Sequence, residues 1–88
     1  MKAASDGLGK RLHDARTKRG LTMDDLADKA KMTQPTISRL ETGQNYPMTI
    51  TVEKLAKALG VDPCWLAYGT GAVPDWELGD KLIEKADD

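Results

Sequence analysis

The strongest constraint on this chain is a pair of short amphipathic segments separated by a very short turn. Residues 23–30 and residues 34–41 each carry apolar side chains at helical spacing, and only three residues lie between them. Two helices joined by so few residues must cross steeply. The side chains available to fill the crossing are Ala27, Met32, Ile37 and Leu40.

Helix start and stop signals predict five helices. The expected spans are residues 6–19, 23–30, 34–41 and 50–59, and a short helix that begins at Pro63 and ends at Gly69. The candidate N-caps are Ser5 or Asp6, Thr22, Thr33 and Asp62, and the candidate stops are Gly20, Gly43, Gly60 and Gly69. With no Phe in the chain, Leu, Ile, Val, Met and Ala must fill the core. The predicted fold class is therefore all-α.

A chain of 88 residues is long enough for one hydrophobic core and too short for two. We expect a domain over residues 1–70 and a C-terminal tail over residues 71–88 that acts as an interaction or dimerisation arm. An amphipathic turn is expected in this tail around Trp76, Leu78, Leu82 and Ile83. Cys64 stands alone, which excludes an internal disulfide, and it is expected to pack at the last helix. The N-terminus lacks a signal-peptide pattern and no stretch is apolar enough to span a bilayer, so a cytoplasmic protein without membrane contact is expected.

The charge of the chain is distributed unevenly. The formal net charge is −1, which by itself argues against a polyanionic partner. Residues 1–45, however, hold nine Lys and Arg against six Asp and Glu, whereas residues 46–88 hold four against eight. If the partner is a nucleic acid, it meets the first half.

Two stretches resemble a known family: GLTMDDLADKAKMTQPTISRLETGQNYP and, after it, LAKALGVDPCWLAYGTG. Together they are similar to the Cro and lambda-repressor type of helix-turn-helix proteins, the XRE family, over roughly residues 8–70. The ending from Trp65 to Gly71 resembles repressors of temperate phages in particular. The resemblance implies a compact five-helix lambda-repressor-like domain that binds double-stranded DNA sequence-specifically and regulates transcription, as a repressor. It also implies a homodimer on a palindromic operator.

In that family the second helix of the motif enters the major groove. The resemblance therefore assigns base contacts to Gln34, Pro35, Ser38 and Arg39. A Gln amide matches the N6 and N7 atoms of adenine, and an Arg guanidinium matches the O6 and N7 atoms of guanine. On an isolated helix such side chains are usually just solvated.

Contacts to the DNA backbone are expected from Thr22, Lys31, Thr33, Thr36, Gln44, Asn45 and Tyr46. Two positions depart from the family pattern. Met23 stands where a Gln usually clamps a phosphate, and it offers no useful donor or acceptor. Lys31 stands in the turn where Gly is common, at a cost of about 1 kcal/mol for a left-handed backbone. A solvated Lys31 and a plain turn at Gln44 to Tyr46 are nearly as well supported.

Arg16 and Glu41 occupy the positions at which the family forms a salt bridge between the first helix and the end of the recognition helix. Such a pair neutralises a carboxylate that would otherwise repel phosphates, and it braces the helix. Four further basic residues of the first helix are either phosphate contacts or a solvated face: Lys10, Arg11, Lys18 and Arg19.

The residue types in the chain also bear on the alternatives to a DNA-binding regulator. An enzyme needs a nucleophile with a base, converging carboxylates or a metal cluster, and the lone His13 has no second ligand nearby, so we expect no enzyme, no cofactor and no metal. An antitoxin that binds a toxin through its tail, the head of a longer phage repressor and a purely protein-binding module remain open. The dimer surface is expected near the last helix and the tail, with Tyr68, Trp76 and Leu78 exposed.

Overall fold

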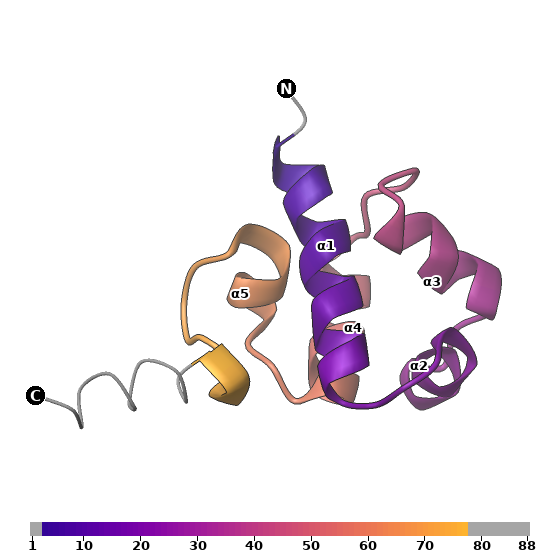
Figure 1. Cartoon of the computed structure of the whole chain (residues 1–88). Coiled ribbons are helices and arrows are strands. Elements are labelled where there is room, and N and C mark those ends of the chain that lie inside the picture. Colours follow the sequence, from indigo (N-terminus) through magenta and orange to yellow (C-terminus); the bar gives the residue numbers. More distant parts are fainter. Residues whose placement is uncertain (1–2, 78–88) are drawn as a thin grey trace, which may run out of the picture.

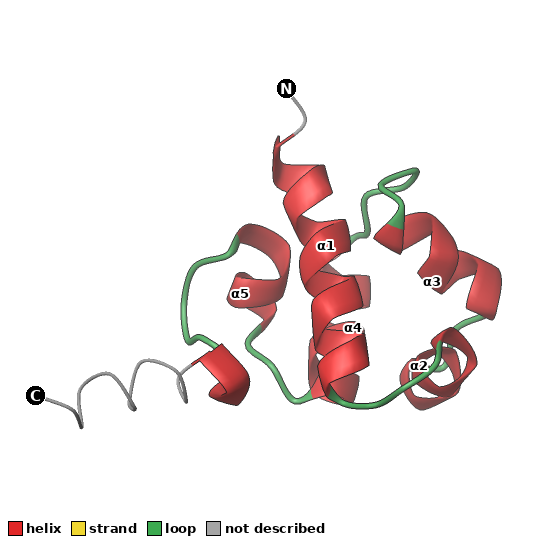
Figure 2. Ribbon diagram, in the orientation of Figure 1, coloured by secondary structure: helices red, strands yellow, loops and turns green. Residues whose placement is uncertain are grey.

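The part of the chain that the structure, a computed structural model, describes contains five helices and one further helical turn at residues 75–77. The structure describes the backbone of residues 3–77 and the side chains of residues 7–77, and these residues contain no strand (Figure 2). The helices are α1 (Ala3–Lys18), α2 (Met23–Ala30), α3 (Gln34–Glu41), α4 (Thr49–Leu59) and α5 (Pro63–Tyr68). The expected all-α, five-helix fold class is confirmed.

Helix α1 lies in the middle of the molecule. It packs against α3 on one side and α5 on the other, while α2 contacts α3 and α4, and α4 contacts α5 (Figure 1). The aliphatic core predicted from the composition runs through all five helices, with one aromatic ring added. Its largest fully buried side chains are Leu8, Leu12, Leu26, Ile37, Leu55, Leu59 and Leu66, and Trp65 lies beside them. In the described part of the chain, no helix has the length and apolar character needed to cross a membrane.

The two motif helices begin and end where the sequence predicts. Helix α2 starts after Thr22, whose hydroxyl accepts a hydrogen bond from the amide of Asp25. It ends at Lys31, which adopts a left-handed conformation with φ 61°. The amide of Met32 then bonds the carbonyl of Ala27 at 2.8 Å, and the amide of Lys31 bonds that of Asp28 at 3.3 Å. This Schellman arrangement satisfies the last carbonyls of α2 although a Lys occupies the strained position.

Two cap predictions and two helix bounds require correction. Helix α1 begins at Ala3, so the candidate caps Ser5 and Asp6 lie inside it, and it ends at Lys18 instead of residue 19. Thr33 holds the N-cap position of α3, but its side chain makes no cap hydrogen bond; its hydroxyl lies 2.8 Å from the hydroxyl of Thr36. Helix α4 begins one residue earlier than expected, at Thr49.

The first part of the tail packs on the domain. Residues 75–77 form a helical turn, and Trp76 meets Trp65 edge to face with 5.9 Å between ring centroids. The expectation that Trp76 is an exposed apolar group is therefore wrong. Cys64, expected to pack, is exposed. The predicted positions of Leu78, Leu82 and Ile83 lie outside the described residues.

Candidate nucleic-acid interface

Helix α3 presents one apolar and one polar face. Ile37 and Leu40 are buried in the core. Gln34, Pro35 and Arg39 are exposed, and Ser38 is half-buried. Positions three and four residues apart are neighbours on a helix surface, so Gln34 and Arg39 join through Ser38 and Pro35. These four side chains form one strip, here called the recognition face. The structure thus brings the four expected base-contacting residues together on the side of α3 away from the core.

The start of α2 is held by a capping box. The Thr22 hydroxyl accepts from the Asp25 amide, and the Asp25 carboxylate accepts from the Thr22 amide, both at 3.0 Å. Hydrogen bonding to the Thr22 backbone amide, followed by the Thr22 side chain, holds the pKa of the Asp25 carboxyl below its usual value. Because the Thr22 amide is already engaged, only the hydroxyl of Thr22 remains to donate to a phosphate. The first amides of the helix, at Met23 and Asp24, have no intrahelical acceptor and point the same way.

Met23 joins the starts of the two motif helices. The Gln34 amide nitrogen donates to the Met23 sulfur over 3.2 Å. Met23 is thus an acceptor within the protein, while the expectation that it gives no phosphate clamp stays a prediction, since a thioether has no hydrogen to donate to a phosphate oxygen. A thioether is a weak acceptor, so it takes one amide hydrogen of Gln34 and leaves the second hydrogen and the carbonyl oxygen for another partner.

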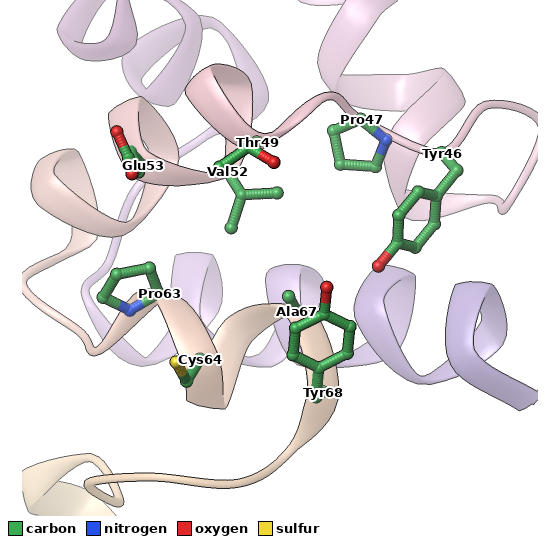
Figure 3. Close-up of a pocket in the computed structure, with 9 residues that line it drawn as sticks. All are labelled: Tyr46, Pro47, Thr49, Val52, Glu53, Pro63, Cys64, Ala67 and Tyr68. Carbon is green, nitrogen blue, oxygen red and sulfur yellow. The ribbon is translucent and has the colours of Figure 1, made fainter.

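The loop after α3 separates into two parts. It leaves the helix through Gly43 in a left-handed conformation, with φ 81°. The Gln44 amide then bonds the Arg39 carbonyl at 2.9 Å. Gln44 and Asn45 are exposed. The Tyr46 ring, by contrast, turns toward α5, where its hydroxyl faces that of Tyr68 (Figure 3). Burial, followed by the neighbouring Tyr68, raises the pKa of Tyr46.

The C-terminal end of α3 is tied to α1 by a buried ion pair, here called the brace. The Arg16 Nε lies 2.6 Å from Glu41 Oε2, and Nη2 lies 3.1 Å from Oε1. The side chains of Arg16 and Glu41 are only 11% and 5% exposed. Hydrogen bonding to Glu41 raises the pKa of Arg16. Arg16 Nη1 also donates to the Leu21 carbonyl at 3.0 Å, which links the brace to the entry of α2.

His13 and Gly9 belong to the same junction between α1 and the end of α3, and neither contact was predicted from the sequence. His13 Nδ1 lies 3.2 Å from Glu41 Oε1 and 3.2 Å from Arg16 Nη2. A Cβ at Gly9 would stand 2.5 Å from the Glu41 carbonyl oxygen and 2.9 Å from that of Leu40. Only glycine therefore permits α1 to approach the end of α3 this closely. A glycine inside a helix of good formers was the available signal for such a contact.

Arg11 of α1 and Arg19, which follows that helix, both have partners inside the protein that were not predicted from the sequence. Arg11 donates to the carbonyls of Leu66 and Ala67 at 2.9 and 2.8 Å, and burial lowers its pKa. These bonds satisfy acceptors near the C-terminal end of α5, where cations are favoured.

Arg19 joins the end of α4 to the start of the tail. It donates to the Leu59 carbonyl at 2.8 Å and to the Asp75 carboxylate at 3.0 Å. Its guanidinium carbon lies 5.0 Å from the centroid of the Trp76 ring, within the range of a cation–π contact. The bond to Arg19 lowers the pKa of Asp75.

A family model described as helix-turn-helix, HTH_3, matches residues 12–66, which is more than half of the chain and includes α2, α3 and the brace. The chain belongs to this helix-turn-helix family. The resemblance to the Cro and lambda-repressor type is thereby confirmed. Relatives that match this region are named HTH-type transcriptional regulators or repressors.

Individual relatives and solved structures agree with this assignment. The HTH-type transcriptional regulator PrtR of Pseudomonas aeruginosa is 39% identical over 67 residues, which cover 76% of this chain. The chain spans only about a quarter of the length of PrtR, 26%. The restriction-modification controller protein C.AhdI of Aeromonas hydrophila is 31% identical with a TM-score of 0.70, over 73% of this chain and 97% of that one. The P22 c2 repressor, solved with a synthetic operator, is 25% identical with a TM-score of 0.68, over 72% and 96%.

Proposed function

We propose that this helix-turn-helix protein binds an operator sequence-specifically and represses transcription from it. In this proposal the protein acts in the cytoplasm. The observation that carries the proposal is the recognition face of α3, which is exposed at one end and braced by a buried ion pair at the other. Gln34 and Arg39 supply paired donors and acceptors for base edges. The proposed contacts to the DNA backbone are made by Thr22, Lys31, Thr33, Thr36, Gln44, Asn45 and Tyr46. A repressor of the same fold was solved with its operator. No observation favours an antitoxin over a transcriptional regulator.

The protein acts as a homodimer on a palindrome in this proposal. A groove of about 200 Å³ runs between the start of α4 and α5, and Tyr46, Val52, Pro63, Cys64 and Tyr68 are among the residues that line it (Figure 3). Tyr68 in its lining is 65% exposed, and Met48 and Ile50, which flank the lining residue Thr49 in the sequence, are 73% and 55% exposed. Such a cluster is typical of a protein contact surface. The tail beyond residue 77 remains a further candidate for a protein contact.

Selection of bound sites from random DNA, followed by footprinting, tests the proposal. The expected result is a palindrome whose half-sites lie about 10 base pairs apart, because a two-fold dimer of this geometry meets successive major grooves on one side of the duplex. Sedimentation of the free protein measures the dimer, and Tyr68→Ala should weaken it. Protection of one asymmetric half-site by a monomer at every concentration would contradict the dimer. Failure to enrich any sequence would contradict the function itself.

A further inference from the structure

A second concentration of positive charge lies outside the recognition face. Four lysines line a hollow between the C-terminal end of α2 and the side of α4: Lys29, Lys31, Lys54 and Lys57. The hollow has a volume of about 260 Å³, and Ala30 and Ala58 complete its lining. It is here called the lysine hollow. All four lysines are exposed.

The lysines of the hollow lack close counter-charges in the described part of the chain. None of the four lies within ion-pair distance of a carboxylate there, whereas Lys10 of α1 and Arg19 both do. Beyond the hydrogen bonds from Thr22, Lys29 contributes to the lowered pKa of the Asp25 carboxyl, so one opposing charge acts from a distance. Helix ends explain part of the arrangement, since Lys29 and Lys57 lie in the last turns of α2 and α4, where cations are favoured. They do not explain why Lys31 and Lys54 converge on the same hollow. Four ammonium groups at one depression raise the local potential and attract anions.

The shape of the hollow selects a small ligand. Alanine side chains are too short to fill the space between the helices, so an opening remains beneath the lysine stems. Its volume is below the range of about 300–1,000 Å³ typical of pockets for drug-sized ligands. Lysine is a compact point charge that binds phosphoryl oxygens without demanding a planar partner. We infer that the lysine hollow is a binding site for an anion that carries two or more neighbouring phosphoryl groups.

Titration with inorganic triphosphate tests this site. In amide chemical-shift mapping of the full chain at about 0.15 M salt, the expected shifts fall on residues 29–31 and 54–58. The double variant Lys54→Gln/Lys57→Gln should weaken triphosphate binding about tenfold, because each exposed charge contributes up to about 1 kcal/mol. The matched control Lys10→Gln/Lys18→Gln removes the same charge from α1 and should change the affinity less than about twofold. An equal loss in both double variants, or shifts centred on α3, would overturn the inference.

The phosphoryl groups could belong to the DNA backbone or to a free polyphosphate. Titration with duplex DNA that lacks the operator distinguishes these two sources. If the DNA backbone occupies the hollow, Lys54→Gln/Lys57→Gln should weaken binding of this duplex and reduce the slope of log affinity against log salt concentration by about two units. If a free polyphosphate occupies it, the variant should weaken the binding of triphosphate and leave the binding of the duplex unchanged. Both outcomes uphold the site. Titration of the unmodified protein with operator DNA tests the proposed function separately. Absence of sequence-specific binding would contradict that function and would leave the triphosphate result unaffected.

Discussion

The two ends of α3 are built in opposite ways. At the C-terminal end, the brace joins Glu41 to Arg16 by two hydrogen bonds inside the protein, and Gly9 allows α1 to approach the helix backbone. At the N-terminal end, Gln34 is exposed, and within residues 7–77 its side chain makes one hydrogen bond, the weak bond to the Met23 sulfur. One end is fixed by the fold, and the other is free to meet a ligand.

This difference shows how a short helix serves as a recognition element. A helix of eight residues has little stability of its own, so its orientation must come from tertiary contacts. Placing the strong contacts at the end farthest from Gln34 orients the helix without consuming the donors and acceptors that face outward. Four variants break or sharpen the comparison: two act at the C-terminal end of α3, one on its exposed face and one at its N-terminal end.

Removal of the carboxylate of the brace is expected to have the largest effect. Glu41→Ala leaves the Arg16 guanidinium unpaired at a site that is 11% exposed, and it should cost about 3 kcal/mol of unfolding free energy. Operator affinity should also fall, although deletion of a negative charge beside DNA would by itself increase it, because α3 loses its orientation. Thermal unfolding and operator titration measure the two effects.

A double-mutant cycle with Arg16→Ala isolates the coupling between the two side chains, and Glu53→Ala, an exposed glutamate of α4, is the matched control. An additive cycle would show that the brace is only a pair of surface charges. Tighter operator binding by Glu41→Ala with unchanged melting would lead to the same conclusion.

Crowding of the same junction is expected to have the next largest effect. In Gly9→Ala the new methyl group meets backbone carbonyls of α3 that cannot move independently of the helix. The variant should lose about 2 kcal/mol of stability from overpacking, even though alanine favours an isolated helix by about 1 kcal/mol over glycine. Denaturant unfolding gives the value. In the control Gly7→Ala the methyl group meets no backbone and only the side-chain end of Arg11, which can shift at the expense of its bonds to α5, so this variant should lose less stability than Gly9→Ala. Equal stability of both variants would disprove the close approach.

On the exposed face, Arg39→Ala should leave unfolding unchanged and lower operator affinity by about 1–3 kcal/mol, the worth of a paired contact to a base edge. The preference at one base pair should relax. Lys31→Ala is the control for a contact to the DNA backbone. It should weaken binding to all DNA sequences alike and reduce the slope of log affinity against log salt concentration by about one unit. An equal loss for Arg39→Ala on operator and random DNA would remove Arg39 from the set of base contacts.

The smallest effect is expected at the N-terminal end. Met23→Leu keeps the volume and removes the sulfur acceptor, so stability should change by less than about 1 kcal/mol. The Gln34 amide is then free to rotate, and the discrimination among bases at the pair it faces should fall by a few-fold. Met23→Gln restores an acceptor and should recover it. Site selection with the three proteins measures this, and identical preferences would show that Met23 does not position Gln34.

Local signals predicted the motif to the residue. Thr22 before an acidic first turn, Pro35 inside the next one and Gly43 after it define α2 and α3 without reference to the rest of the chain. The same logic failed at the start of α1, where Ser5 and Asp6 are good cap residues inside a helix that begins at Ala3. A capping preference of about 1 kcal/mol is not decisive when the neighbouring residues also favour a helix.

The exposed recognition face was predictable because exposure follows from helical period alone once Ile37 and Leu40 are assigned to the core. Arg16 and Glu41 were found only through the family resemblance, since nothing in the spacing of two residues 25 positions apart brings them together. The bond from Gln34 to Met23 was missed because sulfur was dismissed as an acceptor. Whether the face reads bases remains a prediction that the operator titrations address.

The sequence by itself determined the helices and the core stripe, because caps, glycines and the 3.6-residue period act over a few neighbouring positions. The tertiary structure alone decided the partners of Arg11, Arg19 and His13, whose bonds reach 55, 40 and 28 residues along the chain. An arginine on an amphipathic helix looks solvated in sequence whether it faces water or the last carbonyls of another helix. Only the docking of α1 between α3 and α5 distinguishes the two, because it places those carbonyls within hydrogen-bonding distance.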